Sequence, residues 1–284
     1  MKDLLQNRLV TQLIDIAFAE DIGEGDHTSM ATINEDEKGR SIIVAKDDGI
    51  IAGLILVDYI FKKVDPSLHV EVLKKDGDTV KYGDVVINIE GSSRSMLTAE
   101  RTVLNFIQRL SGVATQTAKY VKELEGLHTK ILDTRKTTPG MRLLEKWAVK
   151  IGGGENHRIG LYDMILIKDN HVDFAGGITQ AIDRTANYLK SKNLDLKIEI
   201  ETRSIKEVKQ VLEKGGIHRI MLDNFKPELL QEAVALINKQ YETEASGGIT
   251  IQTLRSYAET GVDYISSGAL THSVKAMDLS MRAV

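Results

Sequence analysis

The sequence of 284 residues contains no cysteine, which excludes disulfides, thiolate zinc sites, iron–sulfur clusters and a cysteine nucleophile. A chain without thiols fits a reducing compartment, and we expect a cytoplasmic protein. Long apolar runs are also missing. The longest, from Ile50 to Val57, is far shorter than the roughly 20 residues that a membrane-spanning helix needs. Residues 1–20 are typical of an amphipathic helix with internal charges and not of a signal peptide, so we expect no membrane partner.

The chain also lacks a large excess of positive or of negative charge. The net charge is −4 and aromatic residues make up 5% of the chain. Neither the overall field nor an extended basic and aromatic stripe favours nucleic acid, which we do not expect as a partner. Any anion site must therefore be a local concentration of lysine and arginine. The length suits one large barrel or two domains.

The first third of the chain mixes helical and strand patterns. Apolar residues at helical spacing predict a helix over residues 3–19. Strands are expected at 40–46, 68–73 and 84–90, with a helix near 54–63 between the first two. Residues 97–124 form a long helical region, which we expect as one helix or as two helices broken near Ser111 and Gly112.

From about residue 129, short apolar strands alternate with amphipathic helices. Strands are expected at 130–132, 164–167, 196–200, 219–222, 242–245 and 264–266. Helices are expected near 141–151, 176–192, 204–214, 226–239 and 250–260. Such repeated units predict parallel strands with helices outside, in a barrel or a doubly wound sheet. With six or seven strands, a barrel would be smaller or more open than the eight-stranded form.

Polar residues follow every expected strand of this second part. They lie in segments 133–136, 168–171, 201, 223–224, 246–248 and 267–269, cationic first, then acidic, then rich in glycine. Ligands of parallel α/β domains bind at the carboxyl ends of the strands. The pattern therefore predicts one anion site that also has a place for a metal or for hydroxyl groups.

The glycine-rich segments suit a phosphate. Ser246, Gly247 and Gly248 precede a helix expected near Thr250, and Ser267 with Gly268 precedes a turn at 269–272. Glycine lets backbone N–H groups approach an anion, and a helix N-terminus adds a favourable dipole. The alternative is that these segments are ordinary turns between strands and helices.

The cationic segments give a stronger signal. Arginine binds carboxylates and phosphates with two parallel hydrogen bonds, and lysine acts as a point charge. Five such groups at one end of the sheet would repel each other without a polyanionic ligand. The alternative is a run of charged side chains on the solvated surface. It explains Lys206 and Lys209, which lie on an expected helix. The five groups are Arg135, Lys136, His157, Arg158 and Lys168.

Glu201 and Asp223 end adjacent strands beside these cations. Two such carboxylates suit Mg²⁺ or ribose hydroxyls. They also suit a cationic, oxocarbenium-like sugar in a transition state. A salt bridge to the cationic group is compatible with each of these roles. The remaining histidines and Trp147 have no ligand spacing, and we expect them to be surface or packing residues.

Several longer motifs indicate a family. The segments Asp133–Gly140 and Gly152–Arg158 are specific, and the match runs in order from Glu20 to the C-terminus. With them, the chain resembles quinolinate phosphoribosyltransferases. The other segments that carry the resemblance are Glu100–Phe106, Ser111–Thr115, Lys168–His171, Glu199–Glu201, Leu222–Asn224 and Glu244–Gly248.

The resemblance implies a fold and an assembly. It implies an N-terminal α/β sandwich domain over residues 1–113 and an open, roughly seven-stranded parallel α/β barrel over 114–269. Residues 270–284 would return to the N-terminal domain. It also implies a homodimer in which Arg101 of one chain reaches the active site of the other.

The implied reaction joins quinolinate to phosphoribosyl pyrophosphate and releases pyrophosphate and CO₂, giving nicotinate mononucleotide. Lys136 would meet the phosphates, and Glu201 and Asp223 would face the ribose and Mg²⁺. Lys136, Lys168, Glu201 and Asp223 would be the catalytic residues. The quinolinate carboxylates would be bound by Arg101, Arg135, His157, Arg158 and Lys168, and the 5′-phosphate by Ser246, Gly247, Gly248, Gly268 and His272.

Two other functions stay open at this point. One is a related phosphoribosyltransferase with a different acid substrate; the arginine set favours a dicarboxylate. The other is a barrel that only binds a phosphorylated metabolite. Such a sensor would not need Glu201 and Asp223 beside the cations.

Overall fold

The computed structural model describes residues 4–284; residues 1–3, where the first predicted helix begins, lie outside this range. The chain divides into two compact units. The first comprises the residues up to Ala118 together with Thr137–Gly153 and Leu270–Val284, and the second comprises Lys119–Lys136 and Gly154–Ala269. Residues 137–153, which the predicted boundaries assign to the barrel, are thus grouped with the first unit. No helix within residues 4–284 has the length and apolar character needed to cross a membrane.

The first unit begins with a capped helix. A short 3₁₀ turn, η1 (Leu4–Gln6), precedes α1 (Arg8–Ile22). Asn7 caps α1, since its side-chain oxygen accepts a hydrogen bond from Leu9 N–H at 3.0 Å. The predicted helix is confirmed, although it starts and ends later than expected. Helix α2 (His27–Thr32) is capped in the same way by Asp26.

An antiparallel sheet forms the core of this unit. Its order is β12 (Leu279–Ala283), β1 (Lys38–Ala45), β5 (Val85–Ser92), β3 (His69–Val72). The predicted strands near 40, 68 and 84 are confirmed. A smaller antiparallel pair consists of β2 (Gly49–Ile50), which precedes helix α3 (Leu54–Val64), and β4 (Thr79–Val80), which follows β3. Because β12 pairs with β1, the last residues of the chain complete the sheet that its first strand begins.

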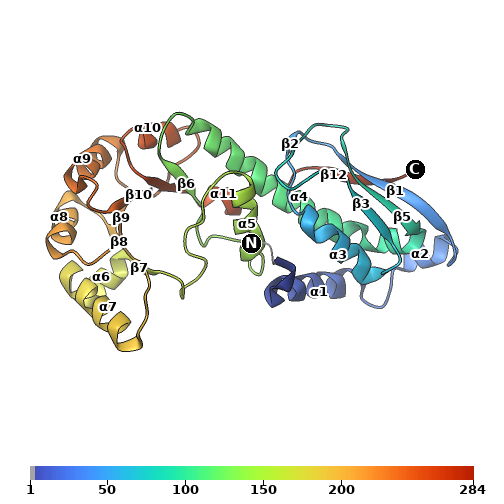
Figure 1. The fold of residues 1–284 in the computed structure, drawn as a ribbon, viewed down its shortest axis with the longest axis horizontal. Helices are drawn as coiled ribbons and strands as arrows, with labels where there is room; N and C mark the ends of the chain where they lie inside the picture. Colours follow the sequence, from blue (N-terminus) through green and yellow to red (C-terminus); the bar gives the residue numbers. More distant parts are fainter. Residues whose placement is uncertain (1–3) are drawn as a thin grey trace. The chain divides into compact units, whose positions relative to one another are not determined.

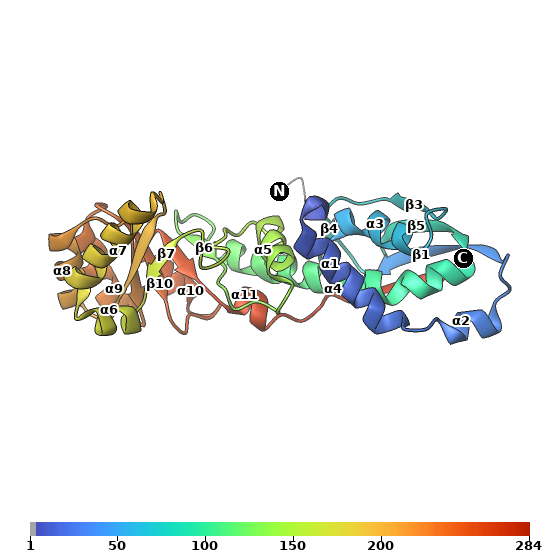
Figure 2. The same ribbon diagram turned by 90° about the horizontal axis from the view of Figure 1, so that it is seen from below.

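Helix α4 (Ser93–Glu123) is continuous, so a break near Ser111 and Gly112 does not occur. These two residues serve close packing instead. The buried Ser111 hydroxyl accepts a hydrogen bond from Ala52 N–H at 2.9 Å. A Cβ on Gly112 would overlap the backbone of Lys275 and Ala276. Figure 2 shows α4 running alongside the strands of this unit.

The second unit is an open parallel sheet. Its six strands run in the order β6 (Lys130–Leu132), β11 (Tyr264–Ser266), β10 (Glu242–Ser246), β9 (Arg219–Asp223), β8 (Ile198–Thr202), β7 (Ile165–Ile167). All six predicted strands are confirmed; the expected count of roughly seven is not. A single bridge from Leu132 to Glu155 extends the sheet beyond β6. Within residues 4–284, the edge strands β6 and β7 are not paired with each other.

Helices cover the outer side of this curved sheet (Figure 1). They are α6 (Asp169–Ala175), α7 (Ile178–Lys192), α8 (Ile205–Lys214), α9 (Pro227–Ile237) and α10 (Leu254–Ala258). Helix α5 (Arg142–Ile151) belongs to the first unit, and the short α11 (Ala269–His272) follows β11. Helix α10 is shorter than the predicted 250–260, because Thr253 Oγ1 accepts Thr250 N–H at 3.1 Å in a preceding turn.

Candidate active site

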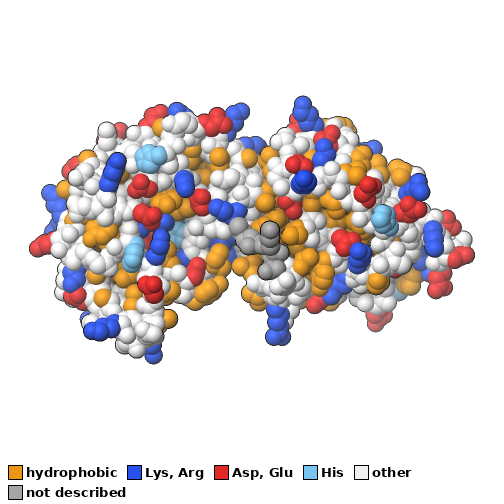
Figure 3. Space-filling model, viewed as in Figure 1, with side chains coloured by type: hydrophobic (Ala, Val, Ile, Leu, Met, Phe, Trp, Pro, Cys, Tyr) orange, Lys and Arg blue, Asp and Glu red, His pale blue; other side chains and the backbone are white. Residues whose placement is uncertain are grey.

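The carboxyl ends of the six strands lie at one edge of the second unit, because every strand pair in this sheet is parallel. Register places Ser246 opposite Asp223, and Glu201 lies one strand further along. Figure 3 shows lysine, arginine, acidic and histidine side chains gathered over the middle of this unit. We call this edge, where the carboxyl ends of the strands lie, the mouth of the sheet. The segments predicted to carry the chemistry therefore all lie at the mouth.

Lys168 faces the two carboxylates of this mouth. Its Nζ lies 3.7 Å from Glu201 Oε2, and about half of the lysine side chain is exposed whereas Glu201 is buried. Burial, with the negative charge of Asp223 nearby, raises the pKa of Glu201 above its ordinary value. Burial also raises the pKa of Asp223, against the Asn224 hydrogen bond and the positive charges of Lys168 and Lys136. The two carboxylates are thus close enough to repel each other, and two lysines offset part of that repulsion.

Two arginines, Arg135 and Arg158, lie close together after β6 and the segment bridged to it. Arg135 follows β6, and Arg158 follows the segment bridged to that strand. Burial and the positive charge of Arg135 lower the pKa of Arg158. The Arg158 Nη1 donates to Met164 O at 3.2 Å, which holds one side of its guanidinium. A pair of like charges held this way favours an anion with two negative groups.

Tight packing explains Gly247, the first glycine after β10, whereas Gly248 has a positive φ of 64° and open space around it. Gly247 has φ 101°, and a Cβ there would overlap the Asn224 side chain and lie 2.9 Å from the Asn224 backbone nitrogen. Asn224 itself has φ 58°, and its N–H donates to Ser246 O at 2.8 Å. Helix α10 starts only at Leu254, so the expected helix N-terminus near Thr250 does not adjoin this turn. A phosphate here would depend on backbone amides and not on a helix dipole.

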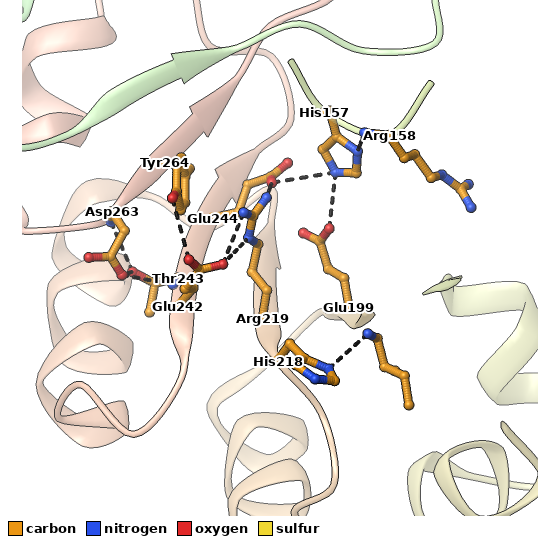
Figure 4. Close-up of polar contacts among 11 residues, drawn as sticks. His157, Arg158, Glu199, His218, Arg219, Glu242, Thr243, Glu244, Asp263 and Tyr264 are labelled. Atoms are coloured by element: carbon orange, nitrogen blue, oxygen red, sulfur yellow. Dashed lines mark hydrogen bonds and ion pairs between the residues drawn. The ribbon is translucent and has the colours of Figure 1, made fainter. Parts of the chain in front are cut away.

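His157 lies deeper than its predicted role suggests. Its side chain is 6% exposed, and its backbone N–H donates to the buried Asp133 carboxylate at 2.9 Å. The ring Nδ1 accepts a hydrogen bond from Arg158 N–H at 2.7 Å. The ring Nε2 lies 3.0 Å from Glu199 Oε2 and 3.5 Å from Glu244 Oε2 (Figure 4).

A charged cluster that the sequence patterns did not predict fills the inside of the sheet below the mouth. Arg219 donates to Glu244 at 3.0 Å and to Glu242 at 3.0 and 3.2 Å, and its guanidinium lies 4.1 Å from the centre of the Tyr264 ring. The available signal was that glutamates occupy every second position at 199–201 and 242–244. In a strand, such alternation puts all the acids on one face.

The two innermost acids hold protons more tightly than exposed glutamates do. Burial raises the pKa of Glu199 from 4.5 to about 7, against the nearby positive charge of Arg219. Burial and the charge of Glu199 raise the pKa of Glu244 to about 7. A ring nitrogen of His157 and one carboxylate oxygen each of Glu199 and Glu244 lie within 4.8 Å of one another. The positive charges of His157 and Arg219 offset part of the rise in the pKa of Glu244.

Two predicted residues belong to the first unit. Arg101 is an exposed residue of α4. His272 ends α11, and its Nδ1 lies 2.5 Å from the Ser273 hydroxyl. Their roles toward the substrate stay predictions, as do those of the other residues that the resemblance implied.

Known proteins show where this chain belongs. Residues 26–111 match the family profile of the quinolinate phosphoribosyl transferase N-terminal domain, and residues 113–282 match that of its C-terminal domain. A protein of Arabidopsis thaliana named "Nicotinate-nucleotide pyrophosphorylase [carboxylating], chloroplastic" is 50% identical, over 95% of this chain and 81% of that protein. A probable enzyme of the same name from Bacillus subtilis (strain 168) is 44% identical, over 95% and 92%.

Solved structures agree with the sequence relatives. The crystal structure of NadC from Streptococcus pyogenes superimposes with a TM-score of 0.92, at 37% identity and over 97% of both chains. The match extends over both units of the fold and includes the motifs that surround the mouth of the sheet. The chain therefore belongs to the quinolinate phosphoribosyl transferase family.

Proposed function

We propose that this protein transfers the phosphoribosyl group of phosphoribosyl pyrophosphate to quinolinate and decarboxylates the product to nicotinate mononucleotide, a step of NAD biosynthesis. The observation that carries the proposal is the shared mouth of the second unit. Cations, two carboxylates and a glycine turn follow neighbouring parallel strands there. The relatives' names, nicotinate-nucleotide pyrophosphorylase [carboxylating], support the same reaction.

The cations account for the acid substrate. Arg135 and Arg158 lie close enough to affect each other electrostatically, and each guanidinium can bind a carboxylate through two hydrogen bonds. Lys168 adds a point charge at the carboxyl end of β7, the edge strand farthest from β6. Arg101, supplied by a second copy of the chain in a homodimer, would complete the set. A dicarboxylate such as quinolinate satisfies more of these charges than nicotinate would.

The remaining residues account for the sugar phosphate. Glu201 and Asp223 would face the ribose hydroxyls and offer the oxygen ligands that Mg²⁺ prefers. Bound Mg²⁺ would offset the charge of the departing pyrophosphate. The phosphates would be met by Lys136, Ser246, Gly247, Gly248, Gly268 and His272.

The chemistry needs no protein nucleophile. The pyridine nitrogen of quinolinate attacks the anomeric carbon, and the bond to pyrophosphate breaks. The ring nitrogen then carries a positive charge, which stabilises the carbanion left when the adjacent carboxylate departs as CO₂; a proton then replaces it. The protein supplies orientation and fixed charge. We assign Lys168 to the side of the ring where this negative charge develops.

A direct assay tests the proposal. The purified protein is incubated with quinolinate, phosphoribosyl pyrophosphate and Mg²⁺, and nicotinate mononucleotide and CO₂ are measured. We expect turnover with quinolinate and little with nicotinate. Turnover of nicotinate or another acid instead would favour a related transferase, and phosphoribosyl pyrophosphate binding without turnover would favour a sensor. We further propose a cytoplasmic location, which the cysteine-free composition supports.

A further inference from the structure

One carboxylate closes the loop that follows Arg158. The two oxygens of Asp163 accept hydrogen bonds from successive backbone N–H groups, that of Ile159 at 2.7 Å and that of Gly160 at 2.8 Å. Bonds from backbone N–H groups to an ionised carboxylate are shorter and stronger than bonds between neutral groups. Because Ile159 follows Arg158 directly, Asp163 holds the main chain immediately beyond the arginine.

The side chain of Arg158 closes the same loop from its other end. Its Nη1 donates to Met164 O at 3.2 Å, and Met164 is the residue next to Asp163. Figure 4 shows the Arg158 side chain extending away from the His157 ring. The direction of the guanidinium is therefore tied to the far end of the loop, and the position of that end is tied to Asp163.

Without such ties, a position beside Arg135 is unfavourable for Arg158. Burial and the positive charge of Arg135 lower the pKa of Arg158, and the negative charges of Glu199 and Asp163 offset part of this. Arginine also has a long side chain, which loses rotamer freedom when it binds a ligand. A loop that already holds the backbone and one edge of the guanidinium, and that adds a negative charge, reduces both costs before a substrate binds.

We propose that Asp163 is a positioning residue for the acid substrate: its carboxylate fixes the loop of residues 158–164, and the loop holds the Arg158 guanidinium where it binds a substrate carboxylate. This inference rests on the proposed function, because it concerns how quinolinate is held. Asp163 acts through Arg158 and needs no contact with the substrate. The sequence motifs did not single it out, because it lies between the segments Gly152–Arg158 and Lys168–His171.

Two substitutions grade the contacts of Asp163. Asp163→Asn keeps one acceptor oxygen, so it can hold one of the two N–H groups, and it carries no charge. Asp163→Ala removes both hydrogen bonds and the charge. We expect the KM for quinolinate to rise about 10–100-fold in Asp163→Ala, because a small displacement of a binding group is costly, and to rise less in Asp163→Asn. The KM for phosphoribosyl pyrophosphate should change little in either variant.

A double-mutant cycle tests whether Asp163 acts through Arg158. In a protein that already has Arg158→Ala, adding Asp163→Ala should raise the quinolinate KM by no more than about twofold, because the group that Asp163 positions is gone. If the two losses multiply instead, Asp163 acts on the substrate by another route, and the inference is wrong.

Asp263 provides a matched control in the same unit. Its carboxylate accepts hydrogen bonds from the Thr243 N–H at 2.9 Å and the Thr243 hydroxyl at 2.7 Å. It precedes β11, so it lies at the amino end of that strand, whereas the mouth lies at the carboxyl ends. Asp263→Ala should leave both KM values unchanged. If Asp163→Ala does not fold, Asp163→Asn, which retains one of the two bonds, decides the test.

Amide hydrogen exchange gives a second readout that does not depend on activity. The N–H groups of Ile159 and Gly160 should exchange faster in the Asp163 variants than in the wild type, and those of β10 should not change. A wild-type quinolinate KM in the Asp163 variants, or KM values for both substrates that rise together, would overturn this inference alone. Absence of quinolinate turnover in the wild-type protein would overturn the proposed function and this inference with it.

Discussion

Both compact units bury charged side chains, but they balance them differently. In the first unit, Glu145 is fully buried against Arg109, with N–O distances of 2.7 and 3.0 Å. Its other oxygen accepts Thr138 N–H at 3.0 Å, and Arg109 also donates to the backbone oxygens of Thr271 and Val274. In the second unit, the two inner acids Glu199 and Glu244 lie beside one arginine, Arg219, and one histidine, His157.

The difference separates two uses of buried charge. One cation and one anion with their hydrogen bonds satisfied hold four segments of the first unit together, which is a structural task. The second unit has more acid than base at its centre, and the pKa values of Glu199 and Glu244 rise to about 7 as a result. An unbalanced interior is costly, and such perturbed groups concentrate at functional sites. Four predictions test this contrast.

The largest effect is expected from breaking the balanced pair. Glu145→Ala leaves Arg109 partly buried without its carboxylate, and removal of one partner of such a pair costs about 3–5 kcal/mol. Urea unfolding measures the change in the free energy of unfolding. An unfolding free energy within about 1 kcal/mol of wild type would show that the pair does not hold the first unit together.

Lys168 supplies positive charge to the acid-rich unit at its mouth. Lys168→Ala should lower kcat about 100–1,000-fold, because a fixed charge near the developing negative charge is lost. Its melting temperature should stay near that of the wild type, since the side chain is half exposed. Lys206→Ala, on the exposed side of α8, is the control and should leave kcat unchanged. A wild-type kcat and KM in Lys168→Ala would contradict its assignment.

The excess of acid also predicts how stability depends on pH. The folded pKa of Glu244 is about 7 against an ordinary 4.5, so the folded state binds this proton more tightly than the unfolded state. The resulting stabilisation is complete below about pH 4.5 and is lost as the pH rises to about 7. Unfolding free energies at pH 5, 6, 7 and 8 should therefore decrease. Glu244→Gln, which stays neutral, should flatten this decrease, and a steeper decrease in the variant would refute the explanation.

The smallest effect is expected where burial is absent. Arg40 and Glu90 form an ion pair at 3.3 Å between β1 and β5, with both side chains mostly exposed. Arg40→Ala should change the urea midpoint only marginally, because water and salt screen such pairs. A loss comparable to that of Glu145→Ala would mean that burial is not what distinguishes these clusters.

Local sequence patterns predicted most of the elements, and tertiary contacts explain the exceptions. Apolar periodicity located all six strands of the second unit and the residues at their ends. Helix α4 is continuous at Ser111 and Gly112, which is one of the two outcomes expected there, and Gly112 allows the backbone at Lys275 to approach the helix. That approach joins positions far apart in the sequence, and no local pattern encodes it.

The acidic interior was missed for a similar reason. Glu199 and Glu244 each occupy a position that, in a strand with one solvated face, would point to water. Only the curvature of the sheet and the pairing of β8, β9 and β10 bring both inside, against His157 and Arg219. The type of each residue at the mouth was predictable, whereas the partners beneath it depend on the assembled sheet.

The pairing of β12 with β1 has a consequence for synthesis. Ser41 lies opposite Ala283, so β1 gains this neighbour only after the strands from β2 to β11 have been made. The parallel sheet from Lys130 to Ser266 lies between them in the sequence and contains all of its own strands. We therefore expect the inserted sheet to fold first on the ribosome, with β1 exposing an unpaired edge, prone to aggregation, until translation reaches β12.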